Sequence, residues 1–429
     1  MDPVAVHTPM AASRLRTLQA LGVFCGFAAG AWLGGAEAPI KLVSAGISPL
    51  TVSLIMVAGV FLARWSIPAL IHGTSYVSKD VCQAPHLIIW AVLAGCMWAV
   101  ANTMTIYAIR DVGLSIAFPL WNTNSLLGIF WGFVLFNELR QAGWSRWLGV
   151  LGGALGMLGG ATLLAFASSS QAPAGKAALG VVAALGAGIL WGTMYIPYRK
   201  AYLTGMNPLS FITFFTFGEL FTMTILAVSY VGAVPLWHEI VGARTVLFWL
   251  MLGGLVWVIG DLFQQYAAKY VGISRGVPLS NTNQIWGLLW GILVFHELQG
   301  GSQRVYAQVI GGSILMALGA VAIALSSATG REHSRWQDAA EREGKRYGIE
   351  GAYVQASMEG REFEAGSSGR SLIDWLLVGG VTAIFVAMAA MARLPRVDID
   401  LRWAAAVSAA MLLLLAGCGI ALWRTTHFS

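Results

Sequence analysis

The chain contains 429 residues, of which 57% are hydrophobic and 11% charged, whereas roughly 25% of the residues of an average soluble domain are charged. Fifteen of the 46 charged residues (26 basic and 20 acidic) lie between Arg331 and Arg370, so the rest of the chain is almost free of charge. This composition excludes a soluble enzyme, a disordered protein and a fibrous protein, and it indicates a polytopic membrane protein. The net charge of +6 requires no nucleic-acid partner, because basic residues are typical of the loops between membrane spans.

Apolar stretches long enough for a bilayer follow one another along the chain, since one crossing needs about 20 apolar residues. Residues 1–17 are expected to form a cytoplasmic N-terminus without a cleavable signal. The first ten predicted spans are 18–37, 49–72, 86–109, 112–136, 146–167, 177–198, 208–232, 245–268, 271–295 and 305–326. A polar linker at 329–371 follows, and the segment 372–424 holds two extra spans at 373–392 and 402–423.

The two halves of the predicted core repeat each other. Residues 98–139 align with 257–298 without gaps, and 17 of the 42 aligned positions are identical. Each repeat, at 18–168 and 177–328, contains five predicted spans, so the second repeat must enter the membrane in the opposite orientation. The sequence therefore predicts an all-α integral membrane protein with a ten-helix core of two inverted five-helix repeats, plus two additional C-terminal transmembrane helices. Inverted repeats are the architecture of many secondary transporters.

The distribution of basic residues predicts the orientation of these spans. With the N-terminus inside, 16 basic residues fall on the cytoplasmic side and eight on the other, with most of the difference supplied by the polar linker. Both termini and the linker are thus predicted to be cytoplasmic, in a multi-pass protein of the cell inner membrane. Within the linker, Arg335–Arg346 is expected to form a charged helix that is either regulatory or inert.

Ionisable side chains inside a membrane cost at least a few kcal/mol and usually face a bundle interior or an aqueous cavity. Asp261 forms one helix face with Gln264, Gln265 and Ala268, and its counterpart in the first repeat is Asn102. An asymmetric carboxylate suits proton coupling, whereas the structural alternative is an interhelical hydrogen bond. Glu219 is a second candidate proton carrier.

Two prolines are expected to kink the first span of each repeat and to free backbone groups that line a cavity. Glu37 precedes Pro39 by two residues, and Tyr195 takes the matching place before Pro197. Glu37 is a candidate for substrate binding or proton coupling, and the alternative is that it neutralises Arg64.

The repeated Pro-Leu-x-Asn-Thr-Asn sequence supplies amides to the same region, namely Asn122, Asn124, Asn281 and Asn283. Amides offer both donors and acceptors, as polyhydroxylated ligands require, although some of them must serve in packing or helix capping. Flat indole rings on which a pyranose can stack are supplied by Trp32, Trp121, Trp191, Trp257 and Trp286. The alternative for each tryptophan is a place in an interfacial belt.

Other motifs carry no chemistry of their own. Glu138 and Glu297 end equivalent spans and are expected to fix the following loop, and the glycine pairs at 152–153 and 311–312 permit close helix packing. The sequence has no Walker loop, zinc-binding helix or nucleophile–base set, so we predict no catalytic residue, metal or cofactor.

These repeated sequences resemble the drug/metabolite transporter superfamily. Within it, Val271–Ser280 with Gly287, Gly291 and Glu297 is similar to the glucose/ribose porter family, which includes glucose uptake proteins and is related to L-rhamnose–proton symporters. Trp257–Gln264 resembles the Trp-x-x-Gly-Asn-Leu-Phe-Gln stretch of that family, with Asp261 where an amide is common. The resemblance covers residues 18–328 and implies a sugar substrate.

The sequence therefore predicts a secondary active transporter of a sugar or a similar small polar metabolite, coupled to protons and working by alternating access. The expected substrate-binding residues are Asn102, Trp121, Asn122, Asn124, Tyr195, Asp261, Gln264, Gln265, Asn281 and Asn283. The alternatives are an exporter of amphiphilic metabolites or drugs and, in another class, a membrane sensor or scaffold that signals through the linker. The expected partners are the substrate, protons and the lipid bilayer, with a homodimer left open.

Overall fold

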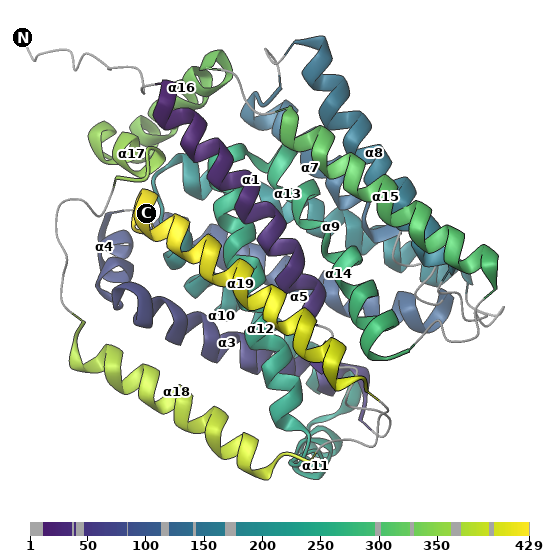
Figure 1. Cartoon of the computed structure of the whole chain (residues 1–429). Helices are drawn as coiled ribbons and strands as arrows, with labels where there is room; N and C mark the ends of the chain where they lie inside the picture. Colours follow the sequence, from purple (N-terminus) through teal and green to yellow (C-terminus); the bar gives the residue numbers. More distant parts are fainter. Residues whose placement is uncertain are drawn as a thin grey trace, which may run out of the picture.

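The computed structural model describes residues 12–36, 38–39, 47–83, 85–112, 120–139, 143–167, 177–296, 302–326, 330–361, 370–393 and 399–428 (Figure 1). Within these ranges the secondary structure is helical, and nine helices are long and apolar enough to cross a membrane. They are α1 (Ala12–Gly35), α3 (Pro49–His72), α5 (His86–Val112), α9 (Ala177–Leu203), α10 (Pro208–Val231), α12 (Leu247–Val271), α15 (Gln303–Leu325), α18 (Leu372–Met391) and α19 (Leu401–Thr426). The predicted all-helical membrane fold is confirmed.

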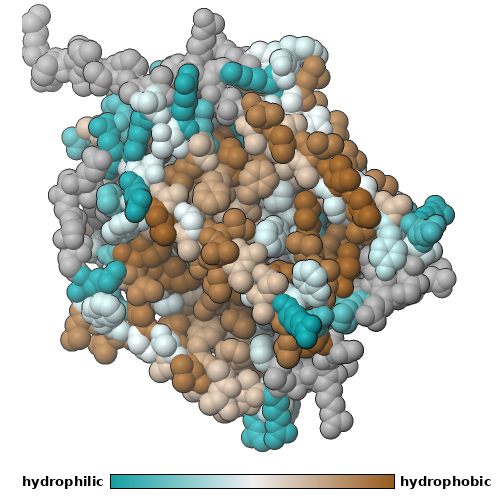
Figure 2. All heavy atoms as spheres, viewed as in Figure 1, coloured by the Kyte–Doolittle hydropathy of each residue, from teal (hydrophilic) through white to brown (hydrophobic). Residues whose placement is uncertain are grey.

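The surface of the molecule agrees with this assignment. Figure 2 shows hydrophobic residues over the middle of the viewed face and hydrophilic residues gathered at its edges. Exposed leucine, isoleucine and valine side chains lie along α15 and α18, including Ile310, Leu318 and Leu376. Such large apolar surfaces are compatible with lipid rather than with water.

Two predicted spans are interrupted. The span at 112–136 contains a turn at residues 122–123, and the span at 271–295 is divided further. Residues 271–295 form α13 (Ile273–Ser280), α14 (Asn283–Leu289) and a π-helical turn at Trp290–Val294 instead of one continuous helix. Gly272 has a φ of 83°, a conformation that glycine adopts without strain, and Pro278 lacks the backbone donor that an uninterrupted helix uses. The equivalent first-repeat helix is α7 (Asn124–Phe136), and α8 (Trp144–Ala167) follows it.

Glycines at the helix crossings come in pairs related by the sequence repeat. A Cβ atom on Gly95 of α5 would lie 2.0 Å from the Phe215 carbonyl oxygen of α10, and one on Gly254 of α12 would lie 2.3 Å from the Met56 oxygen of α3. Gly95 and Gly254 are equivalent positions at the repeat offset of 159, so both halves use the same crossing. This pairing supports the repeat, whereas the orientation of the halves and the domain boundaries stay predictions.

The pairing of α8 with α15 leads to a testable difference between two adjacent glycines. A Cβ atom on Gly153 would lie 2.6 Å from the Gly319 carbonyl oxygen, whereas one on Gly152 would meet nothing within 4 Å. We expect Gly153→Val to destabilise the protein by about 1–3 kcal/mol through overpacking, with a matching fall in the thermal unfolding midpoint in detergent. Gly152→Val is the control for helix propensity. Equal losses in the two variants would contradict this packing.

Helices α16 (Gly330–Tyr347) and α17 (Gly351–Met358) lie at the end of the molecule where α1 begins and the chain ends (Figure 1). The Arg14 guanidinium donates to the Glu359 carbonyl oxygen at 2.9 Å, which ties this segment to α1. The charged helix predicted at Arg335–Arg346 lies within α16. The two C-terminal helices pack on the core, α18 against α3 and α19 against α1, where the Trp32 indole donates to the Met411 carbonyl oxygen at 3.0 Å.

At the opposite end, Glu239 of the short helix α11 (Ala233–Gly242) caps the start of α3. Its Oε2 accepts hydrogen bonds from the Ser48 backbone nitrogen at 3.0 Å, from the Ser48 hydroxyl at 2.8 Å and from the Thr51 hydroxyl at 2.5 Å. Burial alone raises the pKa of Glu239, but the hydrogen bonds from Thr51 and Ser48 outweigh it and hold that pKa below the ordinary value of 4.5.

This cap predicts a pH dependence of stability. A carboxyl whose folded pKa is lowered contributes stability that is fully present above pH 4.5 and is lost as the pH falls through the lowered value. We expect Glu239→Gln to remove that part of the acid dependence and to reduce the unfolding midpoint more at neutral pH than in acid. Unfolding midpoints of the two proteins across the acidic range test this, and parallel curves would contradict it.

Candidate functional site

A cavity of about 520 Å³ lies between helices of both halves. Helices α1, α3, α5, α7, α9, α12 and α14 contribute to its wall, together with residues just before α3, α7 and α14. Small-molecule sites in proteins typically measure roughly 300–1,000 Å³. The cavity is therefore large enough for a small metabolite.

Eight of the ten substrate-binding residues predicted from the sequence line this cavity: Asn102, Trp121, Asn122, Asn124, Tyr195, Gln264, Asn281 and Asn283. The remaining wall is apolar or carries hydroxyl groups, as at Ser53 and Thr105. Among the described wall residues none is Asp, Glu, Lys, Arg or His. Such a wall is suited to a neutral ligand with several hydroxyl groups, because a charged ligand would lose its hydration without gaining a counter-ion.

Two sets of hydrogen bonds hold amides of the wall, and the first of them connects the two halves of the chain. The Asn281 amide donates to Asn124 Oδ1 at 3.1 Å and to the Ser125 hydroxyl. The Gln264 amide donates to the Ser280 hydroxyl at 2.6 Å and to the Tyr195 hydroxyl at 3.3 Å. These bonds fix the amide groups, so their remaining donors and acceptors are held in place for a ligand.

Two buried polar atoms of the wall have no hydrogen-bond partner within the described structure, Trp191 Nε1 and Asn283 Oδ1. Buried polar groups in proteins are rarely left unpaired. One of these atoms is a donor and the other an acceptor, and both belong to side chains that line the cavity.

Four tryptophans surround the cavity in two pairs. The rings of Trp98 and Trp257 lie 5.0 Å apart at 60°, and those of Trp121 and Trp191 lie 6.1 Å apart at 82°. Trp98 was not among the tryptophans predicted to stack on a sugar, although its equivalence to Trp257 in the repeat was the signal that could have identified it. Trp32 and Trp286 belong to the packing core of α1, α12 and α19 instead.

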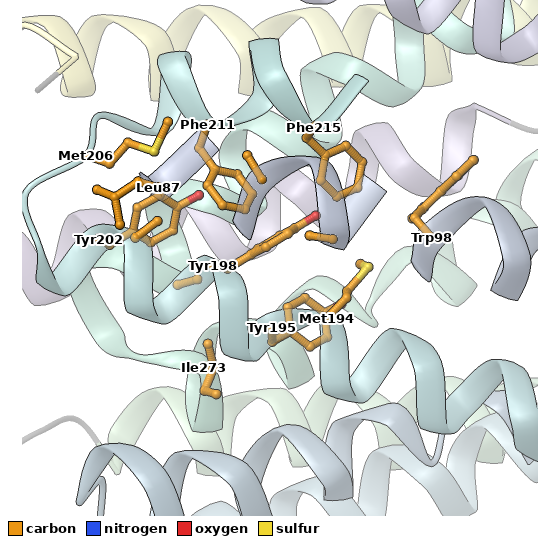
Figure 3. Close-up of a cluster of buried hydrophobic side chains, with 14 of the residues drawn as sticks. Leu87, Trp98, Met194, Tyr195, Tyr198, Tyr202, Met206, Phe211, Phe215 and Ile273 are labelled. Carbon is orange, nitrogen blue, oxygen red and sulfur yellow. The ribbon is translucent and has the colours of Figure 1, made fainter. Parts of the chain in front are cut away.

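An aromatic cluster separates the cavity from the end of the molecule that carries α16. Tyr195, Tyr198 and Tyr202 follow one face of α9, and Phe211 and Phe215 of α10 pack against them (Figure 3). Tyr195 lines the cavity, whereas Tyr198 and Tyr202 are no more than 2% exposed. The cluster therefore closes the cavity on this side.

A buried ion cluster lies beside these rings. The Arg64 guanidinium contacts Asp261 Oδ2 at 2.7 Å through Nη2 and Glu219 Oε2 at 3.2 Å through Nη1. All three side chains are at most 1% exposed. The arginine also lies over the rings of Phe215, at 4.3 Å, and Trp257, at 5.0 Å. Trp257 thus contacts both the ion cluster and the cavity.

The sequence-predicted polar face of α12 is divided between two environments. Gln264 points to the cavity, whereas Gln265 donates to Asp261 Oδ1 at 3.0 Å and accepts from the Tyr202 hydroxyl. Asp261, Gln265 and Glu219 are consequently absent from the cavity wall. Glu37 lies outside the described residues.

A second buried ion pair joins the halves near α16. Arg199 Nε lies 3.0 Å from Glu138 Oε1, and Glu138 accepts from the backbone nitrogens of Ile273 at 3.3 Å and Ser274 at 2.9 Å. Glu138 therefore caps the first turn of α13, which belongs to the other half of the chain. The sequence predicted only that Glu138 fixes its own following loop.

Parts of the chain are similar to known proteins. The model of the family described as Sugar transport protein matches residues 182–348. A Listeria innocua protein named a putative sugar uptake protein is 22% identical over 54% of this chain and 77% of its own length, and a Streptococcus agalactiae protein of the same description is 24% identical over 58% of this chain and 83% of its own. A Streptococcus pyogenes relative is 40% identical over 15% of this chain and 24% of its own length. Residues 182–348 of this chain are therefore similar to the Sugar transport protein family, and more than half of the chain is similar to proteins named as sugar uptake proteins.

Proposed function

We propose that this protein takes up a neutral sugar, or a similarly hydroxylated small metabolite, across the cytoplasmic membrane. The observation that carries the proposal is the cavity wall of amides and four indole rings, without a charged side chain among its described residues. Sugars bind through hydroxyl hydrogen bonds and stack their apolar faces on aromatic rings. The names of the relatives support the same substrate class.

Alternating access is the mechanism that the location of the cavity favours. Ala36, Ile47 and Pro49 form the part of its wall near the α1–α3 connection, at the end opposite α16. The aromatic cluster and the Glu138–Arg199 pair close the α16 end. With α16 in the cytoplasm, as the basic residues predict, the cavity faces the outside, and transport requires the closed end to open.

The ion cluster of Arg64, Glu219 and Asp261 suits proton coupling. One buried guanidinium cannot neutralise two buried carboxylates, and an unpaired charge in this environment is strongly unfavourable. Asp261 accepts hydrogen bonds from both Arg64 and Gln265, whereas neither oxygen of Glu219 has a hydrogen bond and Oε2 lies 3.2 Å from Arg64. Glu219 therefore carries the exchangeable proton, and Asp261 remains the ionised partner of Arg64.

Proton release from Glu219 can affect the cavity through short contacts. A newly charged Glu219 would attract Arg64 away from Asp261, and the Arg64 guanidinium lies against the Trp257 ring. Trp257 and Gln264 lie on α12 on either side of Asp261, and both line the cavity. Protonation and substrate binding thus act on one helix.

Uptake by purified protein in liposomes tests the proposal. We expect labelled neutral sugars from a panel that includes D-glucose to enter, and we expect an inward proton gradient to drive accumulation of at least one. Acidic and phosphorylated sugars serve as controls that the uncharged cavity should exclude. Drug flux without sugar flux under any gradient would contradict uptake and favour an exporter.

A further inference from the structure

Helices α16 and α17, residues 330–358, form a clamp across the end of the molecule that is closed. Arg14 of α1 donates to the Glu359 carbonyl oxygen just after the clamp, and the Ser357 hydroxyl donates to the Gly205 carbonyl oxygen after α9 at 3.0 Å. The clamp is therefore attached to the first helix of each half. Trp336 lies on the side of α16 that contacts the rest of the molecule. It is 1% exposed, although α16 is a highly charged helix.

Trp336 packs on the ion pair that joins the two halves. The Arg199 guanidinium lies 4.3 Å from the centre of the Trp336 ring. Arg199 also donates to the carbonyl oxygens of Ala268 at 3.2 Å and Lys269 at 3.0 Å, at the end of α12. Its partner Glu138 accepts hydrogen bonds from the first turn of α13. Arg199 and Glu138 together therefore bind the backbone on both sides of Gly272.

A second set of contacts attaches the clamp to α5. The Tyr347 ring stacks on His86 with centroids 3.9 Å apart, and Lys200 Nζ lies 3.6 Å from Glu343 Oε2 and 4.7 Å from the Trp90 ring. His86 and Trp90 begin α5 in the first half, whereas Lys200 belongs to α9 in the second half. The clamp thus bridges elements of both halves that must separate if this end is to open.

The space beneath the clamp is almost filled. A gap of about 10 Å³ remains among residues that include Arg199, Tyr202, Lys269, Trp336 and Met358. This is about the smallest space that holds one water molecule. A gap of this size is far too small for a sugar.

We propose that the clamp controls the opening of the closed end of the cavity. Trp336 holds the Arg199–Glu138 pair over the α12–α13 junction, and the cavity opens at this end only when the clamp moves away. The proposal rests on the alternating-access function above. It assigns Trp336 the part of a positioning residue, because α12 carries Gln264 and α13 leads directly to Asn281, both in the cavity wall. Clamp position and the geometry of the binding site are then coupled.

The first test measures opening without any substrate. Leu203, 2% exposed, lines the gap beneath the clamp. In a chain whose four native cysteines are replaced by alanine, a Leu203→Cys reporter is labelled with an impermeant maleimide in inside-out vesicles. Adding Trp336→Ala is expected to raise the labelling rate about fivefold, because loss of the ring–guanidinium contact favours local opening. Trp336→Phe should restore slow labelling.

A tryptophan outside the clamp supplies the matched control. Trp375 of α18 also lies near an arginine, with Arg370 at 5.3 Å from its ring, and it is 51% exposed. Trp375→Ala should leave the labelling rate of the Leu203→Cys reporter unchanged. An unchanged rate in the Trp336→Ala chain, with folding verified by size-exclusion chromatography, would overturn the proposal.

The second test locks the clamp. Lys200→Cys and Glu343→Cys are joined with a short reducible bifunctional thiol reagent in the same cysteine-free chain, and D-glucose uptake into liposomes is measured before and after reduction. Cross-linking is expected to lower uptake at least about tenfold, with full recovery on reduction. Cross-linking Thr74→Cys to Asp374→Cys, where the native side chains lie 2.7 Å apart outside the clamp, should leave uptake intact.

The outcomes separate the clamp from the proposed function. Undiminished uptake by the cross-linked clamp would overturn the clamp and leave sugar transport standing. Absence of sugar uptake before cross-linking, with flux of another solute, would overturn the proposed function, while the labelling test of Leu203→Cys still decides whether the clamp controls access.

Discussion

Glu219→Gln is expected to abolish accumulation of sugar driven by a proton gradient while leaving gradient-free exchange within about threefold of the wild-type rate. Glutamine reproduces the neutral, protonated shape of this side chain but cannot release a proton. The Arg64–Asp261 contact at 2.7 Å would remain, so the closed end should keep its structure. The measurement compares accumulation at imposed pH differences with counterflow of labelled sugar in the same liposomes.

Two further carboxylate variants make this prediction specific. Asp261→Asn should also abolish accumulation, because Glu219 then remains the counter-ion of Arg64 and stays ionised. Glu239→Gln removes a carboxylate outside the ion cluster, at the cap of α3. This variant should accumulate sugar normally. Retained proton-driven accumulation in Glu219→Gln would remove Glu219 from the coupling role.

Hydropathy and the repeat were sufficient to predict most of the helices. The predicted span at 49–72 coincides with α3, and α10 and α18 differ from their predicted limits by one residue. Composition alone is enough to predict such helices. An apolar segment of this length in a membrane must pair its own backbone polar groups, and a helix does so. The interruption at 281–282 was not predicted, because the apolar content of 271–295 conceals a break that depends on Gly272, Pro278 and the neighbouring helices.

The cavity could be predicted because its residues are repeated in the sequence. Asn122 and Asn124 recur as Asn281 and Asn283, and all four line the wall. The division of α12 could not be predicted, because helical periodicity places Asp261, Gln264 and Gln265 on one broad face without saying which neighbours meet it. Arg64 of α3 binds Asp261 on one side of that face, whereas Gln264 on the other side lines the cavity. Similarly, nothing local in the sequence connects Trp336 with Arg199, which are 137 positions apart.

Asn281→Leu is expected to raise the KM for sugar uptake about tenfold, which corresponds to about 1.4 kcal/mol of binding free energy. Asn281 is 8% exposed and donates to both Asn124 and Ser125, so leucine, a side chain of similar length, leaves two buried groups without their donor. The freed Asn124 amide would also lose the orientation in which it faces the cavity.

The matched control for this variant is an amide outside the wall. Asn137 ends α7 with a φ of 55°, and Asn137→Gly keeps that conformation while removing the amide. Its KM should stay within about twofold of the wild-type value. Initial rates of uptake over a range of sugar concentrations separate KM from Vmax in all three proteins. A fall in Vmax with an unchanged KM in Asn281→Leu would mean that Asn281 serves helix packing between the halves, and that the ligand takes its hydrogen bonds from the other amides of the cavity.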